Sequence, residues 1–90
     1  MLEKVKTALR IVSDAFNTEI TDLIKAACAD LGLVGVNAVE TTTDPLLIRA
    51  IITYCRVNFG EPEDYDRLKK SYDEQKAQLI TATGYGLPEE

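Results

Sequence analysis

The sequence of 90 residues contains no histidine and no tryptophan, and only two cysteines, Cys28 and Cys55. Without histidine, the usual base that activates a serine or cysteine nucleophile is missing. Two distant cysteines also cannot supply the paired ligands of a structural zinc site. Both lie on or beside apolar helical stripes, where a free thiol behaves as a small hydrophobe. The sequence therefore predicts no enzyme activity, no metal site and no cofactor.

Positive charge and long apolar runs are also scarce. Ten basic residues stand against 15 acidic ones, which gives a net charge of −5. A protein that grips nucleic acid needs a concentrated basic face, so tight DNA binding is not expected. No apolar run approaches the roughly 20 residues of a membrane span, and Met1–Lys6 does not lead into the apolar core of a signal peptide. We therefore expect that the protein is made in a cytoplasm and that it does not associate with membranes.

Apolar residues at helical spacing predict four helices. Their expected ranges are residues 2–10, 14–31, 45–59 and a last helix that begins after 61–64 and fades near Thr81. Gly32 is expected to end the second helix, and Asp44-Pro45 to begin the third. Residues 32–43 have no helical period and predict a loop.

The predicted fold class is therefore all-α. We expect a small bundle of about four helices, with a short N-terminal helix, two long core helices and an amphipathic C-terminal helix. Residues 1–82 form a single domain in this interpretation. Residues 83–90 have no periodic pattern and are expected to be a flexible C-terminal tail.

The third predicted helix is apolar on most of its sides. One apolar stripe runs through Leu47 and Ile51, and a second contains Ile48, Ile52 and Phe59. A helix that is apolar on most sides is buried on most sides. Two explanations remain open: the helix lies at the centre of the bundle, or a neighbouring subunit covers part of it.

Two arginines, Arg49 and Arg56, lie on the polar side of this helix. They are either a solvated edge or partners in ion pairs between subunits, where arginine is enriched. The candidate subunit interface consists of Ile48, Arg49, Ile52, Arg56 and Phe59. In the tail, Tyr85 and Leu87 are either anchors that become ordered on binding or simply frayed.

The order of three segments resembles a known family. The segments are Val5–Ile11 (VKTALRI), Glu19–Ala27 (EITDLIKAA) and Asp44–Cys55 (DPLLIRAIITYC). Together they resemble the small head–tail connector (adaptor or DNA-packaging) proteins of tailed bacteriophages and prophages, over roughly residues 2–80. The resemblance brings no catalytic residue with it.

The resemblance implies a structural role in the virion, at the head–tail junction, for a protein made in the cytoplasm of the bacterial host. Such proteins form a ring beneath the portal protein, extend the DNA channel and dock the next head-completion or tail protein. The ring is expected to be about twelve-fold, through repeated contacts that close. DNA is then only passing cargo, and the tail with Tyr85 and Leu87 is a candidate contact with the portal.

Two other functions remain as alternatives. A small dimeric adaptor or regulatory module could associate through the third helix. A helix–turn–helix DNA-binding protein fits less well, because the 32–43 connection is too long for its tight turn and no following helix is basic.

Overall fold

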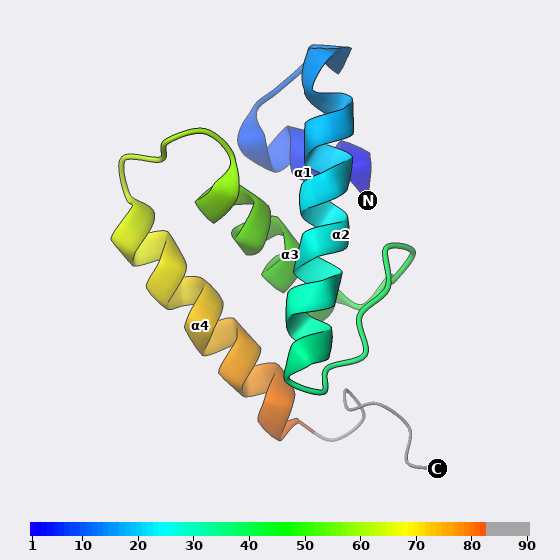
Figure 1. Ribbon diagram of the computed structural model, residues 1–90, viewed down its shortest axis with the longest axis vertical. Coiled ribbons are helices and arrows are strands. Elements are labelled where there is room, and N and C mark those ends of the chain that lie inside the picture. Colours follow the sequence, from blue (N-terminus) through cyan, green and yellow to red (C-terminus); the bar gives the residue numbers. More distant parts are fainter. Residues whose placement is uncertain (83–90) are drawn as a thin grey trace.

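A computed structural model describes residues 1–82, and every element in that part of the chain is a helix. The elements are α1 (Leu2–Leu9), a 3₁₀ turn η1 (Asp14–Phe16), α2 (Asn17–Leu33), α3 (Pro45–Asn58) and α4 (Tyr65–Thr81) (Figure 1). The predicted all-α bundle is confirmed. The predicted domain range 1–82 and the character of 83–90 remain predictions, because that tail lies outside the described residues. No described helix combines the length and the apolar character needed to cross a bilayer.

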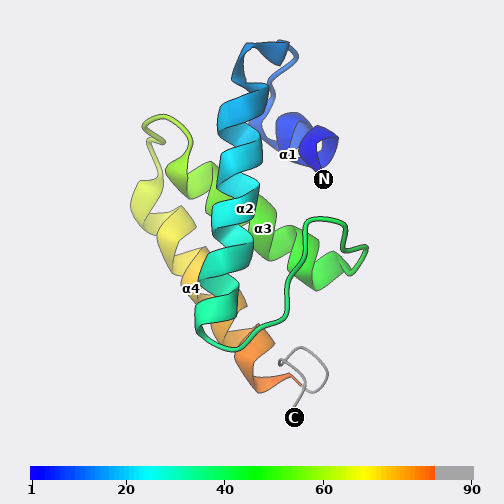
Figure 2. The same ribbon diagram turned by 45° about the vertical axis from the view of Figure 1, so that its right-hand side comes forward.

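Helix α3 is the central element of the bundle. It packs against α1, α2 and α4, and Figure 2 shows it crossing behind α2 between the other helices. Leu47, Ala50, Ile51, Cys55 and Val57 of α3 are all buried. The chain's own helices therefore cover most of this apolar helix, in agreement with the first of the two explanations.

The core is built mainly from aliphatic side chains of all four helices. It is made by Val5 of α1, Ile20, Ile24, Ala27 and Leu31 of α2, the buried face of α3, and Leu68, Tyr72 and Leu79 of α4. Burying each large aliphatic side chain contributes on the order of 1.5–3 kcal/mol. This apolar contact sets how the helices are arranged around α3.

The start of α3 follows directly from its sequence. The side chain of Asp44 accepts hydrogen bonds from the backbone N–H groups of Leu46 and Leu47, at 2.9 and 3.3 Å. Pro45 occupies the first helical turn, where its missing N–H removes no helical bond. The prediction of a helix start at Asp44-Pro45 is confirmed.

The end of α2 differs from its prediction. Gly32 lies inside the helix, and Gly35, with φ of +85°, is the left-handed residue that ends it. The N–H of Val36 donates to the Leu31 carbonyl at 3.0 Å, and the N–H of Gly35 donates to the Gly32 carbonyl at 3.1 Å. This is a Schellman ending, in which the residue after the glycine packs back on the last turn. Val36 is only 1% exposed, and Leu31 is also buried. The burial of Val36 favours a helix that ends with Gly35 and not with Gly32.

Candidate interaction surface

The five predicted interface residues form one partly open side of α3. Arg49 and Arg56 are exposed, whereas Ile48, Ile52 and Phe59 are half-buried. Ile52 and Phe59 also pack against the core of the chain. The open part of α3 is therefore a row of two guanidinium groups beside partly covered apolar side chains. The assignment of these residues to a subunit interface remains a prediction.

A groove lies where the end of α1, the end of α3 and the start of α4 meet. Its volume is about 310 Å³, and it is lined by Ala8, Leu9, Arg10, Arg56, Phe59, Pro62, Asp64 and Leu68. The structure thus brings two predicted interface residues, Arg56 and Phe59, together with residues from two other helices. We call these eight residues the arginine groove. It has an apolar lining flanked by charged groups, the composition typical of a protein-docking surface.

Arg10 in this groove has an unusual backbone. Its φ of 61° and ψ of 40° are left-handed, and no other described residue except glycine has a positive φ. The N–H of Arg10 donates to the Thr7 carbonyl at 3.1 Å, and that of Ile11 donates to the Lys6 carbonyl at 2.9 Å. This is the same Schellman ending as in α2, but an arginine stands where glycine is usual. The left-handed turn places Arg10 at the groove.

Sequence reasoning missed Arg10, although Leu9-Arg10-Ile11 is part of the segment that carries the family resemblance. Nothing in the residue type predicts a left-handed arginine, since the conformation costs an L-residue roughly 1–2 kcal/mol. The available signal was the apolar Ile11 immediately after the helix. An apolar residue at that position is the usual companion of a Schellman ending.

Three arginines on this side of the molecule form no salt bridge within residues 1–82. Arg10, Arg49 and Arg56 form no salt bridge with any residue in the described part of the chain. In contrast, five other basic side chains are paired, namely Lys6, Arg67, Lys69, Lys70 and Lys76. Asp64 in the groove is bonded to Arg67, and that hydrogen bond lowers the pKa of the Asp64 carboxyl. The charge of Arg56 also contributes to the lowered pKa of Asp64, but neither groove arginine forms a salt bridge within residues 1–82, so both can still bind an external carboxylate.

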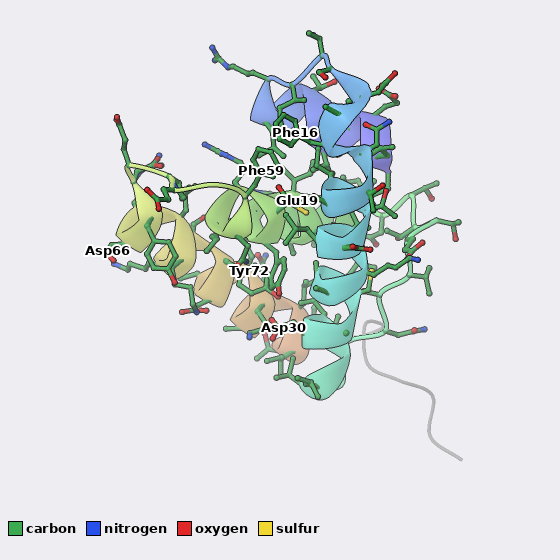
Figure 3. The ribbon with its side chains drawn as sticks, turned by 45° about the horizontal axis from the view of Figure 1, so that its top comes forward. Phe16, Glu19, Asp30, Phe59, Asp66 and Tyr72 are labelled. Carbon is green, nitrogen blue, oxygen red and sulfur yellow. The ribbon has the colours of Figure 1, made fainter. Side chains whose placement is uncertain are left out.

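An aromatic pair borders this surface. The rings of Phe16 and Phe59 meet edge to face, with centroids 5.5 Å apart and an interplanar angle of 88°. Figure 3 shows the two rings together at the end of α3. Phe16 is 46% exposed, and Val12 in the preceding turn is 97% exposed. Apolar surface therefore continues from the arginine groove towards η1.

A second, smaller hollow of about 130 Å³ lies between α2, α3 and α4. Asp30 accepts hydrogen bonds from the Tyr72 hydroxyl at 2.5 Å and from Lys76 Nζ at 3.1 Å. Burial of Asp30 opposes its ionisation, but the hydrogen bonds from Tyr72 and Lys76 outweigh it and lower the pKa of this carboxyl. Figure 3 shows Tyr72 and Asp30 facing one another. These hydrogen bonds connect α4 to α2. The polar side chains in the hollow therefore have a structural role in holding the two helices together.

The two cysteines are placed as expected for packing residues. Cys55 is fully buried, and burial raises the pKa of its thiol to about 12. Cys28 is half-buried, and burial followed by the charge of Glu40 raises its pKa as well. A raised pKa disfavours the reactive thiolate. Among the described residues no group of three or more histidine, cysteine, aspartate or glutamate side chains is arranged to hold a metal ion.

Comparison with known proteins gives one family match. The family model described as "Phage connector protein" matches residues 1–86. Neither the curated proteins nor the solved structures give a significant match to the chain.

Proposed function

The chain belongs to the phage connector protein family, and on this premise we propose that it forms a ring beneath the portal at the head–tail junction. The family match shows that the chain is a structural connector component of a phage particle. The finer proposal is that the ring extends the DNA channel and docks the next head-completion or tail protein. The match over residues 1–86 is the observation that carries this proposal.

Charge and shape of the molecule support a ring of identical subunits. Arg10, Arg49 and Arg56, which form no salt bridge within residues 1–82, lie on one side of a chain whose net charge is −5. Other copies of the chain are therefore a source of the carboxylates that these arginines lack. The arginine groove also differs from the surfaces at the other end of α3. Unlike patches that meet head to tail produce rings when the rotation between copies closes.

Passing DNA fits the same charge balance. A channel wall must let the genome slide, so it needs to avoid the dense phosphate contacts that produce tight binding. The chain has 15 acidic and 10 basic residues, and this acidic balance suits a wall of this kind. DNA is accordingly proposed as cargo and not as a ligand.

The first test is the mass of the assembly, measured by light scattering for the chain alone and after mixing with its cognate portal protein. We expect either a large closed oligomer or a monomer that the portal recruits stoichiometrically, with about twelve copies for a ring that matches portal symmetry. A compact dimer that ignores portal at every concentration would contradict the proposal and favour the dimeric adaptor.

The predicted interface on α3 has its own test. Replacing Arg49 and Arg56 together by alanine is expected to weaken assembly, because both guanidinium groups are exposed and form no salt bridge in residues 1–82. Lys4→Ala combined with Lys25→Ala removes the same charge from exposed positions elsewhere and serves as the control. Unchanged assembly of the double arginine variant would remove these residues from the interface.

Tyr85 and Leu87, the proposed portal contacts, lie outside the described residues, although the family match reaches residue 86. Deleting residues 83–90 is expected to leave the helical content intact, because the four helices and the apolar contacts between them lie within residues 1–82. The same deletion is expected to weaken portal attachment. Loss of helicity in circular dichroism would contradict the first expectation, and undiminished portal binding the second.

A further inference from the structure

Opposite ends of α3 carry two surfaces that complement one another. The arginine groove lies at the C-terminal end of this helix. The α2–α3 loop, residues 34–44, lies at its N-terminal end. A helix of 14 residues separates them by about 21 Å. Figures 1 and 2 both show the loop projecting from the side of the molecule opposite the junction of α3 with α4.

The loop presents a defined apolar and acidic tip. The N–H of Thr42 donates to the Val39 carbonyl at 3.1 Å, which closes a turn with Glu40 and Thr41 at its centre. Val39 is 52% exposed, and Glu40 is exposed and forms no salt bridge within the described residues. On the far side of the turn, the N–H of Asp44 donates to Thr42 Oγ1 at 3.1 Å. We call residues 39–42 the acidic turn.

The groove offers what the acidic turn lacks. Leu9 and Phe59 supply apolar surface of the kind that an exposed valine prefers to water. Arg10 and Arg56, both without an ion partner in the described chain, supply guanidinium groups that bind carboxylates in a fork geometry. One apolar side chain next to one carboxylate is thus matched by an apolar lining flanked by two arginines.

We infer that the acidic turn of one copy docks in the arginine groove of the next copy. In this contact Val39 packs on the apolar lining, and the carboxylate of Glu40 pairs with Arg10 and Arg56. Because the two surfaces are different and lie at opposite ends of one helix, the contact can repeat from copy to copy in one direction, as a closed ring requires. The inference rests on the proposed function, since it specifies the contact between neighbouring subunits of the ring.

Exchanging the two charges tests this pairing. Arg56→Glu alone and Glu40→Arg alone each place like charges at positions 40 and 56 of every contact, so each is expected to weaken association between copies at least about tenfold. The double variant Arg56→Glu/Glu40→Arg restores one pair of opposite charges, although the new arginine also faces Arg10, so association is expected to recover at least about threefold over Glu40→Arg alone. Association is measured by light scattering against concentration, alone and on the portal protein.

A mixture of the two single variants gives a sharper result. In an alternating assembly, the unchanged turn of the Arg56→Glu copy meets the unchanged groove of the Glu40→Arg copy. At the next contact, the arginine introduced in the turn meets the glutamate introduced in the groove. An equal mixture is therefore expected to associate more tightly than either variant does alone. Asp22→Arg and Lys25→Glu make the same charge changes at exposed positions of α2 and are expected to behave as wild type.

Several results would overturn the inference. Wild-type association of either single variant, or no recovery in the double variant and the mixture, would show that Glu40 and Arg56 do not meet. Weakening by Arg56→Glu but not by Glu40→Arg would assign the groove to another acidic segment, such as Glu89-Glu90. In each case, continued recruitment by portal leaves the proposed function standing. A wild-type chain that neither self-associates nor binds portal would overturn both.

Discussion

Individual polar side chains hold this small bundle together at a few points. Lys6 has a side chain that is only 5% exposed, and its Nζ donates to the carboxylate of Asp14 at 2.8 Å. Asp30 similarly accepts hydrogen bonds from two side chains of α4, the Tyr72 hydroxyl and Lys76 Nζ. Buried polar groups need such partners, because an unpaired one loses its bonds to water without compensation. The residue types alone did not indicate these pairs, which join positions 8, 42 and 46 residues apart.

Removing the Tyr72 hydroxyl tests the tie between α2 and α4. Tyr72→Phe keeps the ring that packs edge to face on Tyr54 but deletes the bond to Asp30. We expect the free energy of unfolding in urea to fall by about 1.5–3 kcal/mol, the usual value for a hydrogen bond to a charged group.

Tyr54→Phe is the matched control, since the Tyr54 ring belongs to the same aromatic pair but its hydroxyl does not bond to Asp30. Its effect on the free energy of unfolding is expected to stay within about 0.5 kcal/mol. Equal losses in the two variants would show that the tyrosine rings, and not the Asp30 bond, provide the stability.

The ends of the helices show where local sequence information suffices at the scale of an element. Asp44-Pro45 starts α3 as predicted, because both the capping bond and the proline effect act within three residues. The end of α2 offered two glycines, Gly32 and Gly35, and the sequence favoured the wrong one. Helix α2 continues to Leu33 because Val36 becomes buried only when Gly35 makes the turn.

Alanine substitutions at these two glycines are expected to have opposite effects. Gly32 is helical with open space around its Cβ position, so Gly32→Ala should stabilise the protein by about 0.5–1 kcal/mol. Gly35 has the same open space but a φ of +85°, so Gly35→Ala should destabilise it by about 1 kcal/mol. Urea unfolding of both variants measures the difference, and two changes of the same sign would contradict this account of the helix end.

The whole molecule should have a stability plateau that is bounded by pH on both sides. The hydrogen bond and charge of Lys6 lower the pKa of Asp14, and Asp30 and Asp64 also have a lowered pKa in the fold. A lowered folded-state pKa gives stability that is present above the ordinary value of 3.8 and is lost as the pH falls through the folded one. On the alkaline side, burial raises the pKa of Tyr72 and of Cys55, to about 12 for the thiol.

Thermal unfolding followed across the pH range checks this expectation. Stability should be highest between about pH 5 and 8, fall below about pH 4, and fall again above the ordinary thiol pKa of 9.0. Asp30→Asn is expected to flatten the acid limb, whereas Asp22→Asn, at an exposed position without an ion pair in residues 1–82, should leave its shape unchanged. An acid limb that is identical in both variants would remove Asp30 as a source of the pH dependence.

The sequence by itself determined the four helices, the all-α class and the resemblance to phage connectors. Those features depend on helical periodicity and on capping signals that act within a few residues, as at Asp44. It also singled out Arg56 and Phe59, but as members of a helix face and not as parts of a groove.

Only the tertiary structure decided that α3 is covered mainly by its own chain, that Gly35 and not Gly32 makes the turn that ends α2, and that Arg10 joins Arg56 beside an apolar lining. Each of these depends on which distant side chains are buried against one another. Burial is a property of the packed helices and is not written in any single segment, which is why Arg10 could be located only once α1, α3 and α4 were in place.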